Sequence, residues 1–272
     1  MQNWDEMAAP WLRAEARMEA AHAPVLEALL AASDLRIGHR VLDIGIGSGL
    51  STLRAAQIVG RNGHVTGADV APPFVRRAAE RVPDEVTLVI ADAEVHGFQP
   101  RAFDRVISLF GTMFFSDTIA AFANIRRATA LDGEMTLAAW APPSDNPWLS
   151  VAGRVATEIL GPPPVPTDPA APGPFRFADP EIALQALAAA GWKAQVETRD
   201  LPLTPTGTPN DIAETQMDLG VAARRIADET PDAATIQAIR DEITARFATM
   251  QSAGGAVHVP ARIHLFHAQN AP

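Results

Sequence analysis

The chain has 272 residues, of which 47% are apolar and 20% are charged, with a formal net charge of -10. This length and apolar content suffice for one domain with insertions. Nucleic-acid binding needs clustered Lys and Arg, and the chain has only short pairs such as Arg76-Arg77 and Arg126-Arg127, so no nucleic-acid partner is expected. The absence of cysteine excludes disulfides and thiolate chemistry and fits a reducing cytoplasm.

The histidines and the apolar runs exclude two further classes. The seven histidines lack the HxxxH or HExxH spacing of zinc sites, so no metal is expected. No run approaches the roughly 18 apolar residues of a membrane span, and residues 1–20 hold no apolar signal core. The sequence therefore predicts a cytoplasmic protein without a membrane span, and it leaves the oligomeric state open.

In the first half, short apolar strands alternate with helices. Helical spacing of Trp11, Ala14, Met18 and His22 predicts helix over the first 30 residues, interrupted at Pro24. Strands are predicted at 40–44, 64–69, 86–91, 103–109 and 134–140, and helices at 51–59, 73–81 and 118–130. This alternation implies right-handed crossovers and a parallel sheet with helices on both faces.

The second half is less regular. It predicts a proline-rich surface loop over 162–174 and a helix that begins after the N-cap Asp179 and ends at Gly191. A strand at 193–199, helices at 211–228 and 231–250, and a strand at 262–268 follow. The expected α/β fold is a Rossmann-like, seven-stranded, mostly parallel sheet in a single domain, 1–272. It would comprise an N-terminal helical lid (1–32), a ligand-binding core (36–140) and a helical insertion (204–256) between the last two strands.

The most informative segment is the glycine-rich turn VLDIGIGSG, residues 41–49. Glycines after a strand and before a helix permit a tight turn and let a ligand approach the main chain. The third glycine stands at 49, whereas a dinucleotide fingerprint places it at 50, which is Leu50 here. No Gly-Lys-Ser/Thr follows, so a P-loop is excluded. A plain tight turn without a ligand remains the structural alternative.

Two carboxylates accompany this turn. Asp43 ends the first strand, where its charge would repel a pyrophosphate and suit a cationic ligand. Asp69 ends the second strand, 20 residues after Gly49, where a carboxylate can accept hydrogen bonds from both ribose hydroxyls. The structural alternative for Asp69 is a helix N-cap or a turn.

At this point the sequence resembles a known family. VLDIGIGSG resembles motif I of class I S-adenosylmethionine-dependent methyltransferases, and HVTGADV (64–70) and ADAE (91–94) resemble the family's second-strand and third-strand motifs. FDRVISLFGTMFFSD (103–117) is similar to the fourth-strand motif of the ubiquinone/menaquinone (UbiE-like) subgroup, of which NPW (146–148) and APGPFRFADP (171–180) are also typical. The resemblance is firm over 38–140 and looser elsewhere. It is specific for the cofactor and not for the substrate.

The resemblance implies roles for individual residues. The Gly45 and Gly47 backbone would meet the methionine part of S-adenosylmethionine, and Asp43 would hold its amino group directly or through water. Asp69 would bind the ribose and Asp92 the adenine amino group, although a solvated loop carboxylate is the structural alternative for Asp92. The predicted cofactor contacts are Asp43, Gly45, Gly47, Gly49, Asp69, Val70, Asp92, Ala93 and Leu109. Departures from the family pattern are Ile46, Glu94 and Leu109, and the last of these affects the floor of the acceptor pocket.

The acceptor side is less defined. Large side chains on the N-terminal helix and after the fourth and fifth strands are candidates for an apolar pocket, which suits a hydrophobic or planar acceptor, although such residues are mostly core. These candidates are Trp4, Trp11, Met113, Phe114, Trp140 and Trp148. His22, His96 and His258 are candidates for a general base. A single histidine is more often a hydrogen-bonded structural residue, so the sequence does not identify the catalytic residue. The absence of tyrosine excludes a phenolate base.

The favoured hypothesis is transfer of a methyl group to a small-molecule acceptor (O, N or C) by in-line displacement, with S-adenosylhomocysteine as product. The first alternative is a Rossmann-type nicotinamide oxidoreductase, which Leu50 and the missing Tyr-x-x-x-Lys pair disfavour. The second alternative is a non-catalytic binding protein on the same fold.

Overall fold

A central seven-stranded sheet organises the computed structural model, which describes residues 4–163 and 171–271. The strands are β1 (Arg40–Ile44), β2 (His64–Asp69), β3 (Thr87–Ile90), β4 (Phe103–Leu109), β5 (Thr129–Trp140), β6 (Lys193–Leu203) and β7 (Val259–Gln269). Their order is β3-β2-β1-β4-β5-β7-β6. Neighbours from β3 to β5 are parallel, and β7 lies antiparallel between β5 and β6. The predicted Rossmann-like, mostly parallel sheet is confirmed.

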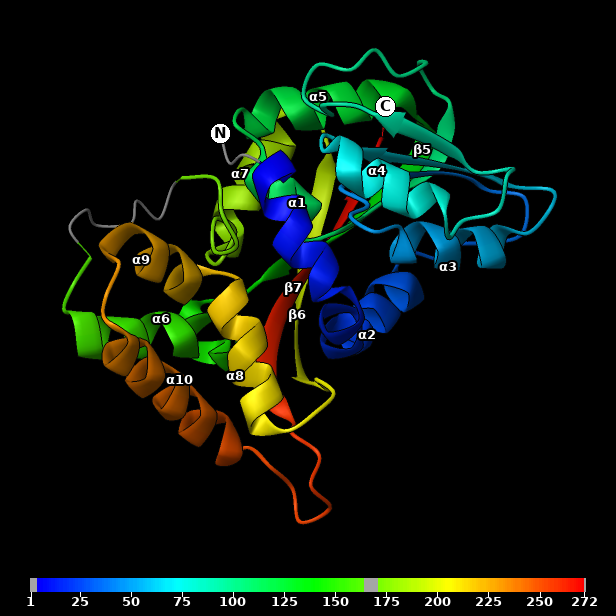
Figure 1. Cartoon of the computed structure of the whole chain (residues 1–272). Helices are drawn as coiled ribbons and strands as arrows, with labels where there is room; N and C mark the ends of the chain where they lie inside the picture. The colour runs from blue at the N-terminus through cyan, green and yellow to red at the C-terminus, as the bar shows by residue number, and fades with distance from the viewer. Residues whose placement is uncertain (1–3, 164–170, 272) are drawn as a thin grey trace.

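Helices cover both faces of this sheet (Figure 1). They are α1 (Trp4–Arg13), α2 (Glu15–Ala32), α3 (Leu50–Val59), α4 (Pro72–Ala79), α5 (Thr118–Ala128), α6 (Pro147–Leu160), α7 (Pro180–Ala189), α8 (Pro209–Asp218), α9 (Val221–Glu229) and α10 (Ala233–Ala248), with the 3-10 turns η1 (Gly111–Phe114) and η2 (Pro143–Asp145). Because side chains alternate along a strand, Val41 packs with α2 and α3, whereas Leu42 joins the larger core that contains Phe122 of α5 and Leu187 of α7.

The N-terminal helices differ from the predicted interruption at Pro24. The chain breaks at Ala14, between α1 and α2, and α2 continues through Pro24. Proline has no N–H for the carbonyl four residues earlier, which is that of Ala20. The hydroxyl of Thr204, just after β6, donates to the Ala20 carbonyl at 3.2 Å instead, and the Thr204 N–H donates to the Ala21 carbonyl at 3.4 Å. A residue remote in sequence thus compensates for the proline.

A group of helices lies beside the ends of β6 and β7, away from α3 and α4 (Figure 1). Three of them, α8, α9 and α10, form the segment between β6 and β7, and the fourth, α6, follows β5. The single helix predicted over 211–228 is wrong, because the chain breaks at Gly220, whose φ of 87° and ψ of -154° favour glycine. Helix α6 was not predicted. Residues 164–170 of the predicted proline-rich loop lie outside the described residues.

Asn146 explains the NPW segment that precedes α6. Its buried side-chain amide donates to the carbonyls of Ala141, Pro142 and Arg262, and its oxygen accepts the Arg262 N–H at 3.1 Å. Pro147 then begins α6, where its fixed φ is favourable. The segment therefore joins the end of β5 to β7. Across the described part of the chain, we find no helix with the length and hydropathy to cross a membrane.

Candidate functional site

The glycine turn lies at the carboxyl ends of β1 and β2, and its three glycines serve different purposes. All three have positive φ: 71° at Gly45, 52° at Gly47 and 88° at Gly49. A Cβ at Gly45 would stand 2.7 Å from Gly111 Cα, and one at Gly49 would stand 2.7 Å from Ala78 Cβ. A Cβ at Gly47 would have no neighbour within 4 Å. Packing of the protein thus requires Gly45 and Gly49, whereas Gly47 borders open space that a ligand can enter.

Asp43 is fully buried behind this turn. One carboxylate oxygen, Oδ2, accepts hydrogen bonds from Ser51 Oγ and Thr52 Oγ1, both at 2.7 Å, and these residues lie in the first turn of α3. The other oxygen, Oδ1, is buried and has no hydrogen-bond partner among the described residues. Burial raises the pKa of Asp43 to about 6, the two hydroxyl hydrogen bonds oppose this rise, and the nearby Asp69 adds to it. A buried carboxylate oxygen without a partner fits a ligand that brings its own donor or positive charge.

Asp69 bridges the ends of β1 and β2. Its Oδ2 accepts the Gly47 N–H at 2.9 Å, and its Oδ1 accepts the Ala71 N–H at 2.9 Å. Burial raises the pKa of Asp69 to about 6, and these backbone hydrogen bonds partly oppose the rise. The two predicted carboxylates therefore lie together at the glycine turn, and neither is on a distant surface.

The third-strand motif lies next to this site in the sheet. The Asp92 carboxylate accepts the Glu94 N–H at 2.9 Å, and the Ala93 carbonyl accepts a hydrogen bond from Asn124 of α5. Val70 is 44% exposed and Ala93 is buried. The Glu94 carboxylate accepts the N–H groups of Ser116 and Asp117 and so connects this loop to the start of α5. The departure at Glu94 thus has a structural role.

Ser108, near the end of β4, and Gly111, just after it, complete the turn, and the sequence analysis assigned neither of them a role. The Ser108 hydroxyl donates to the Ile44 carbonyl at 2.7 Å and accepts the Gly111 N–H at 3.2 Å. A Cβ at Gly111 would stand 2.7 Å from the Ile44 carbonyl oxygen, so this position requires glycine. Leu109 is partly buried between the two main cores. A glycine shortly after a strand, in the segment LFGT, was the available signal.

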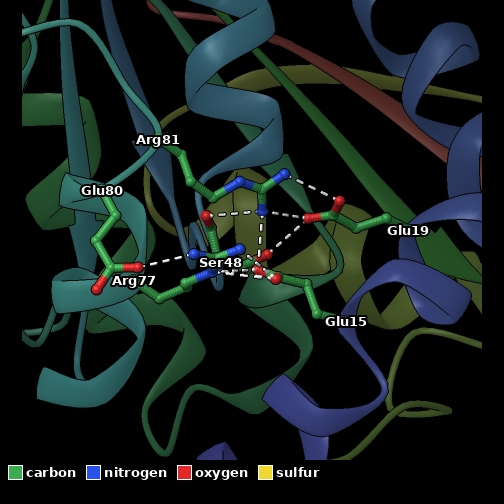
Figure 2. Close-up of polar contacts among 6 residues, drawn as sticks. All are labelled: Glu15, Glu19, Ser48, Arg77, Glu80 and Arg81. Atoms are coloured by element: carbon green, nitrogen blue, oxygen red, sulfur yellow. Dashed lines mark hydrogen bonds and ion pairs between the residues drawn. The ribbon is translucent and has the colours of Figure 1, made fainter.

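An ion-pair cluster connects α2 to the glycine turn and to α4 (Figure 2). Arg81 donates to the Ser48 carbonyl at 3.1 Å, to Glu15 at 2.9 Å and to Glu19 at 2.5 Å. The Ser48 hydroxyl donates to Glu19 at 2.8 Å, and Arg77 pairs with Glu15 at 2.8 Å. The Arg81 side chain is 18% exposed, so water screens these pairs only in part. No local sequence pattern indicated this cluster, because its members lie up to 66 residues apart.

The aromatic candidates separate into two groups. Trp4 of α1 packs edge-on against Phe114, with ring centroids 4.7 Å apart, and Trp11 packs edge-on against Phe74 of α4 at 5.4 Å. Trp11 and Phe74 share a small core with Ala71, which follows the Asp69–Val70 segment. The structure therefore places Trp4 and Trp11 on the β2–α4 side of the site.

The second aromatic group surrounds His22 of α2. The His22 ring lies 5.5 Å from Phe110, 5.6 Å from Trp140 and 6.2 Å from Trp148. Phe110 and Trp140 stack with centroids 4.1 Å apart and an interplanar angle of 11°. Trp148 and Met113 are each 1% exposed and belong to the main core. Trp140 and Trp148 therefore belong to one cluster around His22, whereas Trp4 and Trp11 pack against Phe114 and Phe74.

The other histidines lie elsewhere. His96 packs against Phe98 near the third-strand motif, and His258 is exposed before β7. Among the described residues, no group of three His, Cys, Asp or Glu side chains is arranged to hold a metal ion.

Comparisons with known proteins agree with this geometry. The family model described as "Methyltransferase domain" matches residues 41–133. Aklanonic acid methyltransferase DauC of a Streptomyces species is 38% identical over 113 residues, which are 40% of this chain and 50% of that protein. Nocamycin O-methyltransferase of Saccharothrix syringae is 34% identical over 189 residues, 65% of this chain and 66% of that protein. These matches thus span about half to two thirds of the length of these relatives.

The fold comparison extends further along the chain. The crystal structure of the YcgJ protein from Bacillus subtilis superposes with a TM-score of 0.59 at 19% identity, covering 92% of this chain and 100% of that one. The likeness shows a shared fold. The family model and the relatives identify a methyltransferase domain over residues 41–133 and support a class I S-adenosylmethionine-dependent methyltransferase, and the sheet order fits that fold.

Proposed function

We propose that this protein transfers the methyl group of S-adenosylmethionine to an oxygen of a small, planar and largely apolar molecule. The observation that carries the proposal is the glycine turn, where an open Gly47 stands beside two buried carboxylates. A ligand with a positive charge and a ribose matches both features. The proposal includes the finer subgroup, similar to the ubiquinone/menaquinone methyltransferases, whose fourth-strand motif the sequence resembles.

The cofactor would be held mainly by the first three strand ends. Asp43 Oδ1, which has no partner among the described residues, would accept the methionine amino group, and the Gly45–Gly47 backbone and the main chain at Leu109 would lie against the same moiety. Asp69 would exchange part of its bonding to Gly47 and Ala71 for the ribose hydroxyls. Asp92 would bind the adenine amino group, between Val70 and Ala93.

Methyl transfer requires of the protein mainly that it align the reacting atoms. When bound, S-adenosylmethionine supplies a methyl group activated by a sulfonium. The protein therefore has to place the acceptor atom in line with the methyl carbon and the sulfur and exclude water. We assign the exclusion of water to the N-terminal segment 1–32 and the insertion 204–256, because Arg81 fastens α2 to the glycine turn and Thr204 fastens it to the insertion.

The acceptor class follows from the lining and from the relatives. Aromatic side chains from α1, η1 and β5 (Trp4, Phe114 and Trp140) lie near the carboxyl ends of β4 and β5, which supports a planar acceptor. The two relatives are named for aklanonic acid and for O-methylation of nocamycin, so a small-molecule oxygen is the preferred acceptor atom.

Calorimetry with S-adenosylmethionine and S-adenosylhomocysteine tests the cofactor part. We expect binding by the wild type and at least a tenfold loss in Asp69→Ala, the value of one charge-assisted hydrogen bond. The absence of binding at millimolar cofactor, or full binding by Asp69→Ala, would overturn it. NADH binding with no response to S-adenosylmethionine would instead favour the oxidoreductase. Cofactor binding without turnover on a broad acceptor panel would favour the non-catalytic alternative.

A further inference from the structure

His22 is a polar group in aromatic surroundings, and the described contacts give its Nε2 no partner. The Nε2 atom is buried without a hydrogen bond, which is costly unless a partner arrives. Burial alone lowers the pKa of His22 to about 4, so the ring is neutral at pH 7. The groups that face it from the β4–η1 junction, β5 and α6 are the uncharged Phe110, Trp140 and Trp148. On α2 itself the nearest acid, Glu19, is engaged by Arg81 and Ser48.

Phe110 of this aromatic cluster directly precedes Gly111, which packs against Gly45 of the glycine turn. Phe110 has a φ of 68° and a ψ of -1°, a left-handed conformation that is rare and strained for a bulky residue. Its N–H donates to the Ala138 carbonyl at 3.1 Å, and the next residue, Gly111, lies against Gly45. With this strained backbone conformation, Phe110 stacks its ring on Trp140, while the following Gly111 lies at the glycine turn.

We propose that His22 is a catalytic residue that receives the acceptor: its Nε2 accepts a hydrogen bond from a phenolic or enolic hydroxyl of a planar acceptor that lies against the Phe110–Trp140 pair. This inference rests on the proposed function and names the chemical group that it methylates. A neutral imidazole suits this place, because a charged one would repel the sulfonium.

The hydroxyl proton that the acceptor loses during methyl transfer is taken up by His22 within the site. As the acceptor oxygen bonds to the methyl carbon, the carbon–sulfur bond breaks and its electron pair remains on sulfur. The hydroxyl proton moves to Nε2, so one positive charge disappears from sulfur as another forms on the imidazole. Aromatic rings about 6 Å from a cation stabilise it, and Phe110, Trp140 and Trp148 lie near that distance. The imidazolium afterwards returns its proton to water.

The test uses binding rather than turnover, with S-adenosylhomocysteine present and a matched pair of probes, 2-hydroxyanthraquinone and anthraquinone. We expect the wild type to bind the hydroxylated probe at least tenfold more tightly, as one buried hydrogen bond implies. His22→Phe keeps an aromatic ring and removes the nitrogen. It should bind both probes equally, at the affinity that the wild type has for anthraquinone.

Two controls separate the possible failures. Calorimetry should show unchanged S-adenosylhomocysteine affinity in His22→Phe, and its thermal midpoint should be no lower than that of the wild type. His22→Gln, whose amide can still accept a hydrogen bond, should recover part of the preference for the hydroxylated probe. Equal binding of both probes by the wild type, or a preference that survives in His22→Phe, overturns the role of His22. If the wild type does not bind S-adenosylhomocysteine at all, that result overturns the proposed function instead.

Discussion

The proposed cofactor side and the proposed acceptor side of this candidate site are built in different ways. On the cofactor side, residues 43–49 and 69 supply the main features within two short segments, and most of the contacts involve backbone groups. On the acceptor side, His22, Phe110, Trp140 and Trp148 come from four separate elements and meet through side-chain rings. The first side is a local motif, whereas the second exists only when α2 is in place.

The difference has a physical origin. A turn that binds a fixed ligand through backbone N–H groups depends on φ and ψ, which nearby glycines control. An apolar pocket depends on packing volume, which many sequences satisfy. The following predictions test this contrast, and the largest expected effect comes first.

The glycines should separate structural from ligand-binding roles. Gly45→Ala combines a positive φ with a Cβ 2.7 Å from the Gly111 backbone, so it should lower the free energy of unfolding by about 3 kcal/mol or more and weaken cofactor binding over 100-fold. Gly47→Ala, with positive φ but no steric neighbour, should cost only about 1–2 kcal/mol of unfolding free energy yet weaken binding at least tenfold. Denaturant unfolding and calorimetry measure both. Equal destabilisation by the two changes would refute the distinction.

Asp43→Asn should weaken S-adenosylmethionine binding about 10- to 100-fold, because it removes the buried charge that would face the methionine amino group. Its thermal midpoint should not fall, since the amide oxygen keeps the Ser51 and Thr52 hydrogen bonds. Asp104→Asn is the matched control. Asp104 pairs with Arg40 at the start of β4, at the opposite edge of the sheet, and its loss should leave cofactor affinity within twofold. Similar losses in both variants would count against the assignment of Asp43.

Cofactor affinity should also depend on pH. Asp43 has a pKa of about 6, raised mainly by burial, so its carboxylate is mostly ionised at pH 7 and mostly protonated at pH 5. Because a cationic ligand favours the ionised form, the dissociation constant for S-adenosylmethionine should rise about tenfold as pH falls from 7 to 5. Calorimetry across this range measures the change. Asp43→Asn should flatten the profile to the part contributed by Asp69, and a profile unchanged by this substitution would show that another group is responsible.

The smallest effect is expected at the ion-pair cluster of Figure 2. Arg81→Gln should speed the release of S-adenosylhomocysteine about fivefold, because it loosens α2 from the Ser48 carbonyl at a net cost of about 1 kcal/mol. Arg246→Gln, which breaks pairs with Glu158 and Glu242 on the helical insertion side, is the control and should change release less than twofold. Stopped-flow tryptophan fluorescence measures both rates, and equal rates in the two variants would separate the cluster from cofactor release.

Much of the fold and of the geometry of the candidate cofactor site was predictable from the sequence. Strand–helix alternation indicated the sheet, and VLDIGIGSG with Asp69 indicated the turn, because both signals are local and depend on backbone geometry. The helix break at Gly220 and the continuity of α2 through Pro24 were not predictable in the same way. The second depends on Thr204, a residue 180 positions further along the chain.

By itself, the sequence determined the cofactor class, since a few glycines and carboxylates at fixed spacing specify a turn and its charge. Only the tertiary structure decided that Gly47, unlike Gly45 and Gly49, borders open space, that Arg81 joins α2 to Ser48, and that His22 lies among Phe110, Trp140 and Trp148. These features arise where segments distant in the sequence pack together. Many side chains along the chain determine that packing jointly, so no short sequence pattern predicts it.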